Sequence, residues 1–279
     1  MGKIPVTLTQ KEFEEHVEPY LSRAERGFVS KIPLYKIFNY ILYILYTGCQ
    51  WHTLTIDRLP SGKPEITYKG VYYRFSKWCR DGSFEKVWHN SVDSIKDIPD
   101  LSEINIDGTH TVAKKGGKSA VWQGRKKAET TNILPVTDKK GYPVASTEII
   151  PGNHHDAFGL EDNLRNIFKD MKGRKLPVGG AHFNADSAFD TKGARKICFG
   201  NKVIPNIAEN RRNRKSPRRG RPRLFNEKIY RNRFAGIGRT FAWVDKFRRL
   251  LVRFERNDKY FYGFHCVAFA MICLRSLFV

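Results

Sequence analysis

Residues 9–92 carry apolar side chains at helical spacing, which predicts a unit built of helices. The segment 34–46 is apolar almost all round and is expected to be a buried helix, ended by Thr47-Gly48. Two more helices are expected over 69–80 and 84–95. The first of these two carries an aromatic stripe at helical spacing, which is typical of a core face: Tyr72, Phe75 and Trp78.

Beyond a short Pro/Asp linker at residues 97–100, the pattern changes to that of strands. Ile104 and Ile106 alternate with polar neighbours, which predicts a half-buried strand that contains Asp107. Further strands are expected at 132–137, 142–150, 176–183 and 202–207, with a hairpin turn at 138–141. One helix is expected to start after Asp156 as N-cap, to pass through Leu160, Leu164, Ile167 and Phe168, and to end at Lys172-Gly173, and another helix is expected at 191–198.

The order of these elements is three antiparallel-type strands, helix, strand, helix, strand, followed by helices at 227–254 and 260–278. It matches the RNase H-like layout, an α+β fold with a mixed sheet flanked by helices. We therefore expect two domains: a small helical N-terminal domain at 1–96, suited to DNA binding, and an RNase H-like domain at 101–279.

The charge of the chain narrows the class of partner. Lys and Arg number 50 against 28 Asp and Glu, a net charge of +22, which points to a polyanion. Nucleic acid is the first candidate and a membrane surface the alternative, but no signal segment or membrane-length apolar run is evident. The five scattered cysteines are expected to be reduced and buried, and we expect a cytoplasmic, nucleoid-associated protein.

A basic run at 211–223 is the strongest candidate for contact with phosphates, and it is expected to form a loop. Arg74, Lys77 and Arg80 stand on other faces of their helix than the aromatic stripe, so they either meet phosphates or are simply solvated. The predicted DNA-binding residues are Arg74, Lys77, Lys115, Lys118, Arg125, Arg211, Arg212, Arg214, Lys215, Arg218, Arg219, Arg221, Arg223, Arg233 and Arg239.

Two aspartates have equivalent settings: Asp107 in the first strand and Asp186 just beyond the fourth. If those strands are neighbours, the two carboxylates converge, and a divalent cation is their natural partner because like charges repel. Oxygen ligands suit Mg²⁺ or Mn²⁺, which could activate a nucleophile for phosphodiester cleavage. The plainer alternative is two unrelated loop aspartates. His110 either contacts the scissile phosphate or is a hydrogen-bonded structural histidine.

Several motifs together resemble bacterial insertion-sequence transposases of the DDE, RNase H-like class. They are Ile106–His110, Pro151–Asp156, Asn184–Asp190 and Arg239–Trp243, with Thr47–Trp51 and Val71–Phe75 in the helical region. The resemblance implies DNA strand cleavage and transfer at terminal inverted repeats, Asp107 and Asp186 as metal ligands, and a homodimer on double-stranded DNA.

The chain departs from the family pattern at its third acid. The family has a Glu four residues after the Arg that Arg233 matches, directly before an Arg-Thr-Phe-Ala-Trp motif. Counting from Arg233 reaches Ile237, whereas counting back from Arg239 reaches Gly238, and neither is a carboxylate. Asp245 is a weak substitute. Two hypotheses follow: a transposase, impaired by this loss, or a catalytically inactive transposase-derived protein that binds the repeats as a repressor or competitor.

Overall fold

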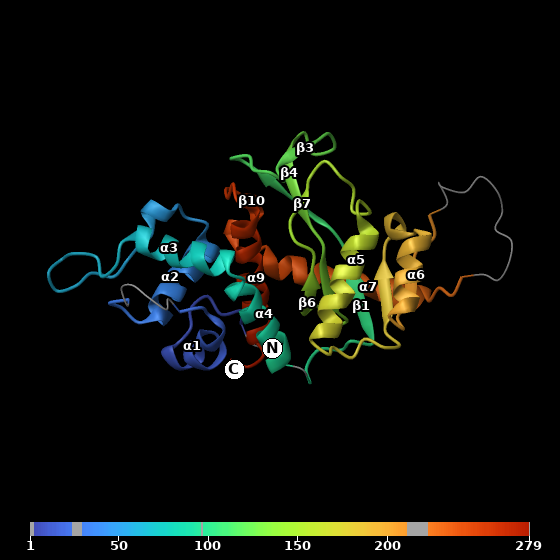
Figure 1. Cartoon of the computed structure of the whole chain (residues 1–279), viewed down its shortest axis with the longest axis horizontal. Coiled ribbons are helices and arrows are strands. Elements are labelled where there is room, and N and C mark those ends of the chain that lie inside the picture. The colour runs from blue at the N-terminus through green and yellow to red at the C-terminus, as the bar shows by residue number, and fades with distance from the viewer. Residues whose placement is uncertain (1–2, 24–29, 96, 211–222, 279) are drawn as a thin grey trace. The chain divides into compact units, whose positions relative to one another are not determined.

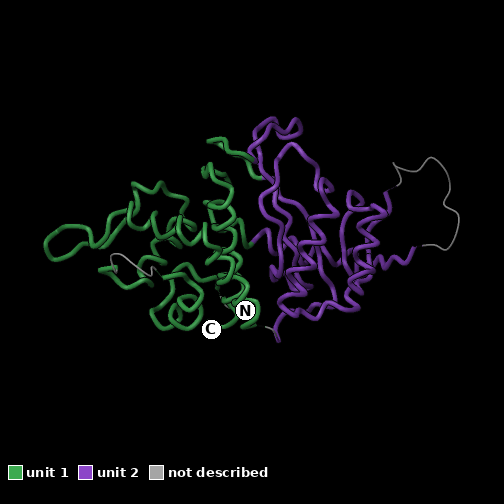
Figure 2. Tube along the Cα trace, in the orientation of Figure 1, with its two compact units in different colours: residues 1–96, 111–118, 243–279 green, residues 97–110, 119–242 purple. Residues whose placement is uncertain are grey.

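The computed structural model describes residues 3–23, 30–95, 97–210 and 223–278. Within these residues the chain forms two compact units, shown in Figure 2. Unit 1 comprises residues 1–96, 111–118 and 243–279, and unit 2 comprises residues 97–110 and 119–242. Most of the predicted basic run, residues 211–222, lies outside the described residues.

Unit 1 is helical, and its elements can be followed in Figure 1. Its helices are α1 (Gln10–His16), α2 (Leu34–Thr47), α3 (Tyr68–Arg80), α4 (Ser83–Ser94), α8 (Arg248–Leu251) and α9 (Asp258–Leu274). Short 3₁₀ turns are η1 (Glu18–Tyr20) and η2 (Trp51–Thr53). Strand β10 (Val252–Arg253) pairs in parallel with the end of β2 (Thr109–Ala113).

The core of unit 1 is aromatic. Phe75 of α3 stacks on Phe264 of α9 with ring centroids 4.3 Å apart, and Trp88 of α4 lies 4.9 Å from Phe269. The Tyr262 hydroxyl donates to Glu85 at 2.8 Å. The N-terminal helices are therefore packed on the C-terminal helix, a contact that the helical pattern of residues 9–92 alone did not predict.

Two expectations for the helices were met only in part. Gly48 ends α2 with a φ of 71°, as predicted for the glycine after this helix. However, α2 is not buried all round, because Tyr43 and Tyr46 are 42% and 43% exposed. Phe75 and Trp78 of the aromatic stripe are fully buried, whereas Tyr72 is 39% exposed.

Unit 2 is built on a mixed five-stranded sheet with the order β6-β5-β1-β8-β9. The central strand β1 (Glu103–Ile106) runs antiparallel to β5 (Pro135–Asp138), which pairs with β6 (Pro143–Ser146). On its other side, β1 runs parallel to β8 (His182–Ala185), and β8 runs parallel to β9 (Ile204–Ile207). This order confirms the predicted RNase H-like fold.

Helices cover both faces of this sheet. On one face lie α5 (Leu160–Gly173) and α6 (Lys192–Gly200), with Phe168 of α5 packed 5.9 Å from Phe183 of β8. On the other lies α7 (Glu227–Val244), whose Gly236 approaches Asn105 of β1. The remaining elements of the unit are β3 (Val121–Gln123), β4 (Ala128–Ile133), β7 (Ile150–Pro151) and η3 (Ser187–Phe189).

Three predicted boundaries were wrong. Asp107 does not lie inside a strand, because the expected strand is split into β1 and β2 and Asp107 follows β1 directly. Asp156 does not cap a helix: α5 begins at Leu160, and its N-cap is Gly159 with a φ of 59°. The helix expected over 227–254 is divided into α7, α8 and β10. The hairpin turn at 138–141 is confirmed by the bond from the Gly141 N–H to the Asp138 carbonyl.

Candidate functional site

Three buried asparagines form a ladder across the strands that lead to the two aspartates. Asn184 of β8 donates to the Asn105 amide oxygen at 2.9 Å, and Asn206 of β9 donates to that of Asn184 at 2.7 Å. The ladder fixes the strand register, in which Asn105 is opposite Asn184 and Asn184 opposite Asn206. Because unpaired buried amides are costly, this register is strongly specified.

The same register brings Asp107 and Asp186 together. Each lies two residues beyond a laddered asparagine, at the carboxyl end of neighbouring parallel strands. Side chains two residues apart point to the same face of a strand, so both aspartates are directed to the face that α7 covers. The Asp107 carboxylate accepts from the Gly108 N–H at 2.9 Å, and that of Asp186 accepts from the Ala188 N–H at 2.8 Å.

The electrostatics of Asp107 reflect this convergence. Burial raises the pKa of Asp107 above its usual 3.8, and the bond from Gly108 opposes that rise. The carboxylates of Asp156 and Asp186 raise the pKa further, while Arg233 acts to lower it. Asp107 therefore lies among like charges, with a single arginine acting against them in this balance.

Arg233 projects from α7 and is 8% exposed. Its guanidinium is sandwiched between two rings, 4.0 Å from the Tyr230 centroid and 3.8 Å from that of Phe234. The pKa of Tyr230 is raised, mainly by burial. Arg233 acts to lower this pKa, and the nearby carboxylates of Asp186 and Asp107 act to raise it. The face of α7 that carries Tyr230 and Arg233 is thus the face beside the two aspartates.

Asp156 belongs to this site, although the sequence predicted only a helix cap for it. Its Oδ1 accepts from Asn132 Nδ2 at 2.7 Å and lies 3.5 Å from His110 Nε2. His110 is half-buried, and its Nδ1 lies 3.0 Å from the Gln123 amide nitrogen. His110 thus has two partners within the protein, Gln123 and Asp156. Spacing in the sequence gave no signal that Asn132 and Asp156 meet.

Asp190 is a second acid that sequence reasoning did not assign. Its carboxylate accepts from Arg195 Nε at 2.9 Å and from the Asn210 N–H at 3.0 Å, and it forms an ion pair with Arg223. Burial acts to raise the pKa of Asp190, but these partners outweigh it and the pKa is lowered. The residues on either side of the 211–222 segment are thus bound to one carboxylate.

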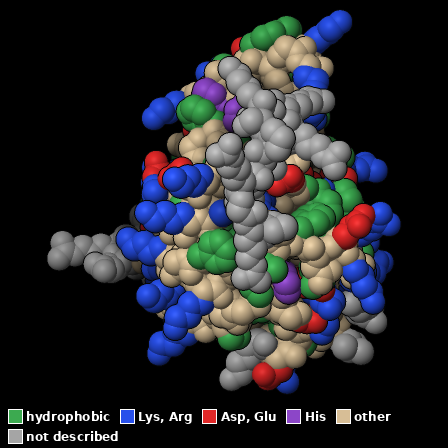
Figure 3. All heavy atoms as spheres, turned by 90° about the vertical axis from the view of Figure 1, so that its right-hand side faces the viewer, with side chains coloured by type: hydrophobic (Ala, Val, Ile, Leu, Met, Phe, Trp, Pro, Cys, Tyr) green, Lys and Arg blue, Asp and Glu red, His purple; other side chains and the backbone are tan. Residues whose placement is uncertain are grey.

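The remaining predicted DNA-binding residues are placed separately. Lys115 and Lys118 are exposed in unit 1, and Arg125 is exposed in unit 2. Arg239 is exposed and donates to the Lys140 carbonyl at 2.9 Å. Arg211, Arg212, Arg214, Lys215, Arg218, Arg219 and Arg221 lie outside the described residues. On the side of unit 2 that carries α6, Figure 3 shows many Lys and Arg side chains among fewer Asp and Glu.

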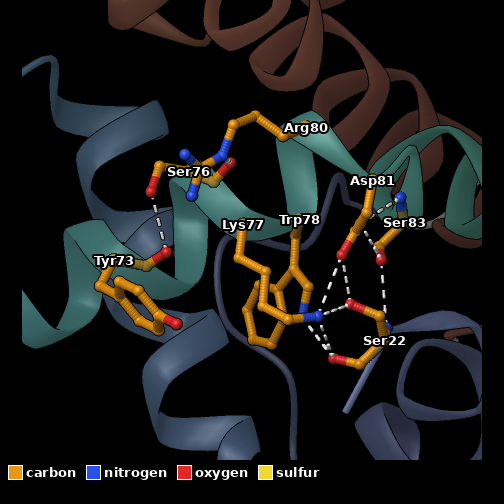
Figure 4. A network of polar contacts seen from close by, with 8 residues as sticks. All are labelled: Ser22, Tyr73, Ser76, Lys77, Trp78, Arg80, Asp81 and Ser83. Carbon is orange, nitrogen blue, oxygen red and sulfur yellow. Dashed lines mark hydrogen bonds and ion pairs between the residues drawn. The ribbon is translucent and has the colours of Figure 1, made fainter. Parts of the chain in front are cut away.

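Lys77 and Arg80 of α3 are engaged within unit 1, as Figure 4 shows. Lys77 Nζ contacts the Ser22 hydroxyl and donates to Asp81 Oδ2 at 3.0 Å. Arg80 Nε donates to the Ser76 carbonyl at 3.2 Å. Arg74 lies on the same helix and is half-buried. The ammonium of Lys77 therefore has a structural role that the sequence did not predict.

Asp107 and Asp186 offer carboxylate oxygens, the donor set that Mg²⁺ and Mn²⁺ prefer, and these donors fit such a cation. The two positions of α7 where the family pattern places the third acid are occupied by Ile237, which is buried, and by Gly238, which has open space around its Cα. Among the described residues, no group of three or more His, Cys, Asp or Glu side chains is arranged to hold a metal ion. Asp245 belongs to unit 1, and Asp107 and Asp186 belong to unit 2.

Two family models match most of the chain. Residues 8–88 match the family described as "Putative transposase of IS4/5 family", and residues 99–273 match "Transposase DDE domain". No match was found among curated proteins. No helix in the described ranges has the length and apolar character needed to span a bilayer.

Two solved structures of Mos1 transposase align with most of the chain. The paired-end complex with the left transposon end is 13% identical, with 91% of this chain and 82% of that chain covered and a TM-score of 0.29. The Mos1 mariner paired-end complex with Mn is 12% identical, with 95% and 85% covered and a TM-score of 0.27. The family models cover most of the sequence, and the chain belongs to the DDE transposases of insertion sequences.

Proposed function

We propose that this transposase binds the terminal inverted repeats of its element and catalyses metal-dependent DNA cleavage and strand transfer, with Asp107 and Asp186 as catalytic metal ligands. The observation that carries the proposal is the register of β1 and β8, in which each of two paired parallel strands is followed by an aspartate at the same edge. A chance pair of loop aspartates would not share the asparagine ladder that leads to both.

Mg²⁺ or Mn²⁺ is the proposed cation. When bound, such an ion would activate a water or a 3′-hydroxyl and stabilise the leaving oxygen of a phosphodiester. The protein's part is to hold the two carboxylates convergent. Arg233 limits the local negative charge, and because the rings of Tyr230 and Phe234 hold its guanidinium, it does so from a fixed position.

Double-stranded DNA is the proposed partner, bound by a homodimer in the bacterial cytoplasm and nucleoid. A net charge of +22 supports attraction to phosphates. The affinity for DNA should fall as the salt concentration rises, because binding releases counterions from the DNA. Arg74, Lys115, Lys118, Arg125, Arg239 and the basic residues of 211–221 remain the proposed phosphate contacts. Arg223 is left out because it pairs with Asp190, and Arg233 because it lies near Asp107 and between the rings of Tyr230 and Phe234. Lys77 is left out because Asp81 and Ser22 hold its ammonium.

The missing third acid favours a second candidate function, a protein that binds the repeats without cutting them. The site supplies two carboxylates from β1 and β8, while the face of α7 beside them presents Ile237. The loss of the third carboxylate ligand weakens binding of the cation, and the cation is what positions and activates the reacting groups at the phosphate. Cleavage by this chain is therefore expected to be slow. If cleavage is lost altogether, the protein would still bind the repeats and act as a repressor or competitor.

One assay separates the two functions. A labelled duplex that carries the inverted repeat flanking the gene is incubated with the purified protein and 5′ or 3′ products are resolved, with Mn²⁺ or Mg²⁺ or with a chelator. If the protein is an active transposase, we expect nicks that depend on the metal ion. Asp107→Asn and Asp186→Asn should abolish these nicks, while both variants should still shift the duplex in a gel. A shift with no nicks supports the binding-only protein. Nicks that survive both substitutions would overturn the proposed catalytic site.

A further inference from the structure

Asp156 is held against the backbone beside Asp107 by a contact that only glycine permits. A Cβ placed on Gly108 would lie 2.2 Å from Asp156 Oδ1 and 2.6 Å from its Cγ. Any side chain at position 108 would displace the carboxylate. The residue that follows Asp107 is therefore a glycine for a packing reason, and the contact brings a third acid to the candidate metal site.

A second glycine fixes the segment that carries Asp156. A Cβ on Gly152 would lie 1.9 Å from the Thr130 carbonyl oxygen, so the chain is pressed onto β4 at this point. The Gly152 N–H donates to the Ser119 carbonyl at 3.3 Å, and Thr130 Oγ1 donates to the Gly152 carbonyl at 3.3 Å. Asp156 is thus presented by an anchored segment.

The hydrogen bonds of Asp156 favour its charged form. Both close partners, Asn132 Nδ2 and His110 Nε2, approach the same oxygen, Oδ1. His110 faces Asp156 through Nε2, at 3.5 Å from Oδ1, and the Gln123 amide nitrogen lies 3.0 Å from His110 Nδ1 and 3.4 Å from its Nε2. Burial acts to raise the pKa of Asp156, but His110 and Asn132 outweigh it and the pKa is lowered.

We propose that Asp156 strengthens cation binding at Asp107 and Asp186 through its negative charge, acting from behind Gly108 without being a ligand itself. It partly compensates for the acid that α7 lacks. The inference rests on the proposed metal site. In it, Asp156 is a positioning residue that acts through the electric field of its carboxylate and through its contact with Gly108. Outer residues of metal sites commonly change affinity by about 10- to 100-fold, and a charge that makes no direct bond belongs at the lower end.

Asp156→Asn tests this cleanly, because an asparagine can keep its oxygen toward Asn132 and His110 while losing the charge. Binding of Mn²⁺ to the full chain is measured by titration calorimetry and by the electron paramagnetic resonance of free Mn²⁺. The matched control is Asp162→Asn, which removes the same charge from an 82% exposed side chain that pairs with Arg165. Thermal unfolding verifies that each variant is folded.

The expected result is a Mn²⁺ dissociation constant about tenfold higher for Asp156→Asn, and unchanged for Asp162→Asn. If Asp156 has only a structural role, the affinity of Asp156→Asn for Mn²⁺ should equal that of the wild type. That result would overturn the inference, while the proposed metal site would stand. Wild-type protein that binds no Mn²⁺, or binds it equally after Asp107→Asn, would overturn both.

Gly108→Ala provides a second, independent arm. The added Cβ forces the Asp156 carboxylate away without removing its charge, so affinity should fall in the same direction. If Asp156→Asn and Gly108→Ala are both folded and both bind Mn²⁺ as tightly as the wild type, the inference is refuted.

Discussion

Asp107 is a half-buried carboxylate on which two others, Asp156 and Asp186, act with the same sign, opposed by Arg233. Such an arrangement costs folding free energy when no cation is bound. The asparagine ladder holds the two strands before Asp107 and Asp186 in register, and the Gly108 contact keeps Asp156 beside Asp107. Strain of this kind, kept by the surrounding structure, is typical of functional sites.

Asp107→Asn should therefore stabilise the metal-free protein while destroying the site. Removing the repelled charge is worth about 1 kcal/mol, which raises the unfolding temperature of a chain this size by about 2–4 °C. Mg²⁺ should raise the unfolding temperature of the wild type and leave that of the variant unchanged. Differential scanning calorimetry with and without Mg²⁺ measures both effects; a variant less stable than the wild type contradicts the account.

The position of the missing acid can also be decided at the residue scale. The two sequence anchors point to Ile237 and Gly238, and α7 runs without a break through both. Ile237 is 2% exposed and follows Arg233 by one helical turn, so it lies on the face beside the aspartates. Gly238 is exposed and turned away from that face.

Ile237→Glu should thus restore or increase metal-dependent nicking, whereas Gly238→Glu should not. We expect at least a tenfold gain, equivalent to about 1.4 kcal/mol of barrier. Ile237→Gln is the matched control, since it has the same length without the charge. Rates on the labelled repeat are measured with Mn²⁺ in excess. A gain from Gly238→Glu alone would mean that the helix presents the other face.

At the scale of elements, α7 and β1 approach each other closely at Gly236. A Cβ on Gly236 would lie 2.9 Å from Asn105 Nδ2 and 3.1 Å from the Asp138 carbonyl oxygen. The neighbouring Gly238 has open space around it. Glycine is unfavourable in a helix interior, and of these two glycines of α7 only Gly236 has a packing reason to be glycine.

The two glycines should respond oppositely to alanine. Gly236→Ala forces α7 away from the asparagine ladder and should destabilise by about 1–3 kcal/mol. Gly238→Ala removes backbone freedom without a clash and should stabilise by about 0.5–1 kcal/mol. Urea unfolding at equilibrium gives both values, and each variant is the control of the other. Equal effects of the same sign would contradict the described packing.

Local sequence was enough for the order of the main strands and helices of the sheet, but not for the short strands β3, β7 and β10 or for long-range contacts. Alternation around Ile104 and Ile106 predicted β1, and the strand–helix order predicted the RNase H-like sheet, which then placed Asp107 near Asp186. Asp156 was assigned to a cap because the segment before α5 resembles one, and its real partner Asn132 is 24 residues earlier. Bonds of this kind carry no local signature.

At the scale of the whole molecule, compact units and matched families divide the chain differently. The family matches end at residue 88 and begin again at residue 99, near the predicted division between 1–96 and 101–279. Unit 1, however, joins residues 1–96 with 243–279. The reason is aromatic packing: α9 provides Phe264 and Phe269 to the helices α3 and α4. As a functional division, the two predicted domains remain a proposal.

Residues 1–96 produced alone should fail to unfold cooperatively. Without α9, the rings of Phe75 and Trp88 would be exposed, and each large aromatic side chain contributes about 1.5–3 kcal/mol on burial. The same residues joined by a flexible linker to 243–279 should regain a cooperative transition. Circular dichroism in urea compares the two. A sharp transition in residues 1–96 alone would show that the N-terminal helices are self-contained after all.

The central claim is that Asp107 and Asp186 hold one divalent cation between neighbouring strands. A crystal of the protein grown with Mn²⁺ and measured at the manganese absorption edge tests it directly. The account predicts an anomalous peak within coordination distance of both carboxylates, about 2.0–2.3 Å from their oxygens, and none there for Asp107→Asn. Two carboxylates that point apart, with manganese bound elsewhere or not at all, would contradict it.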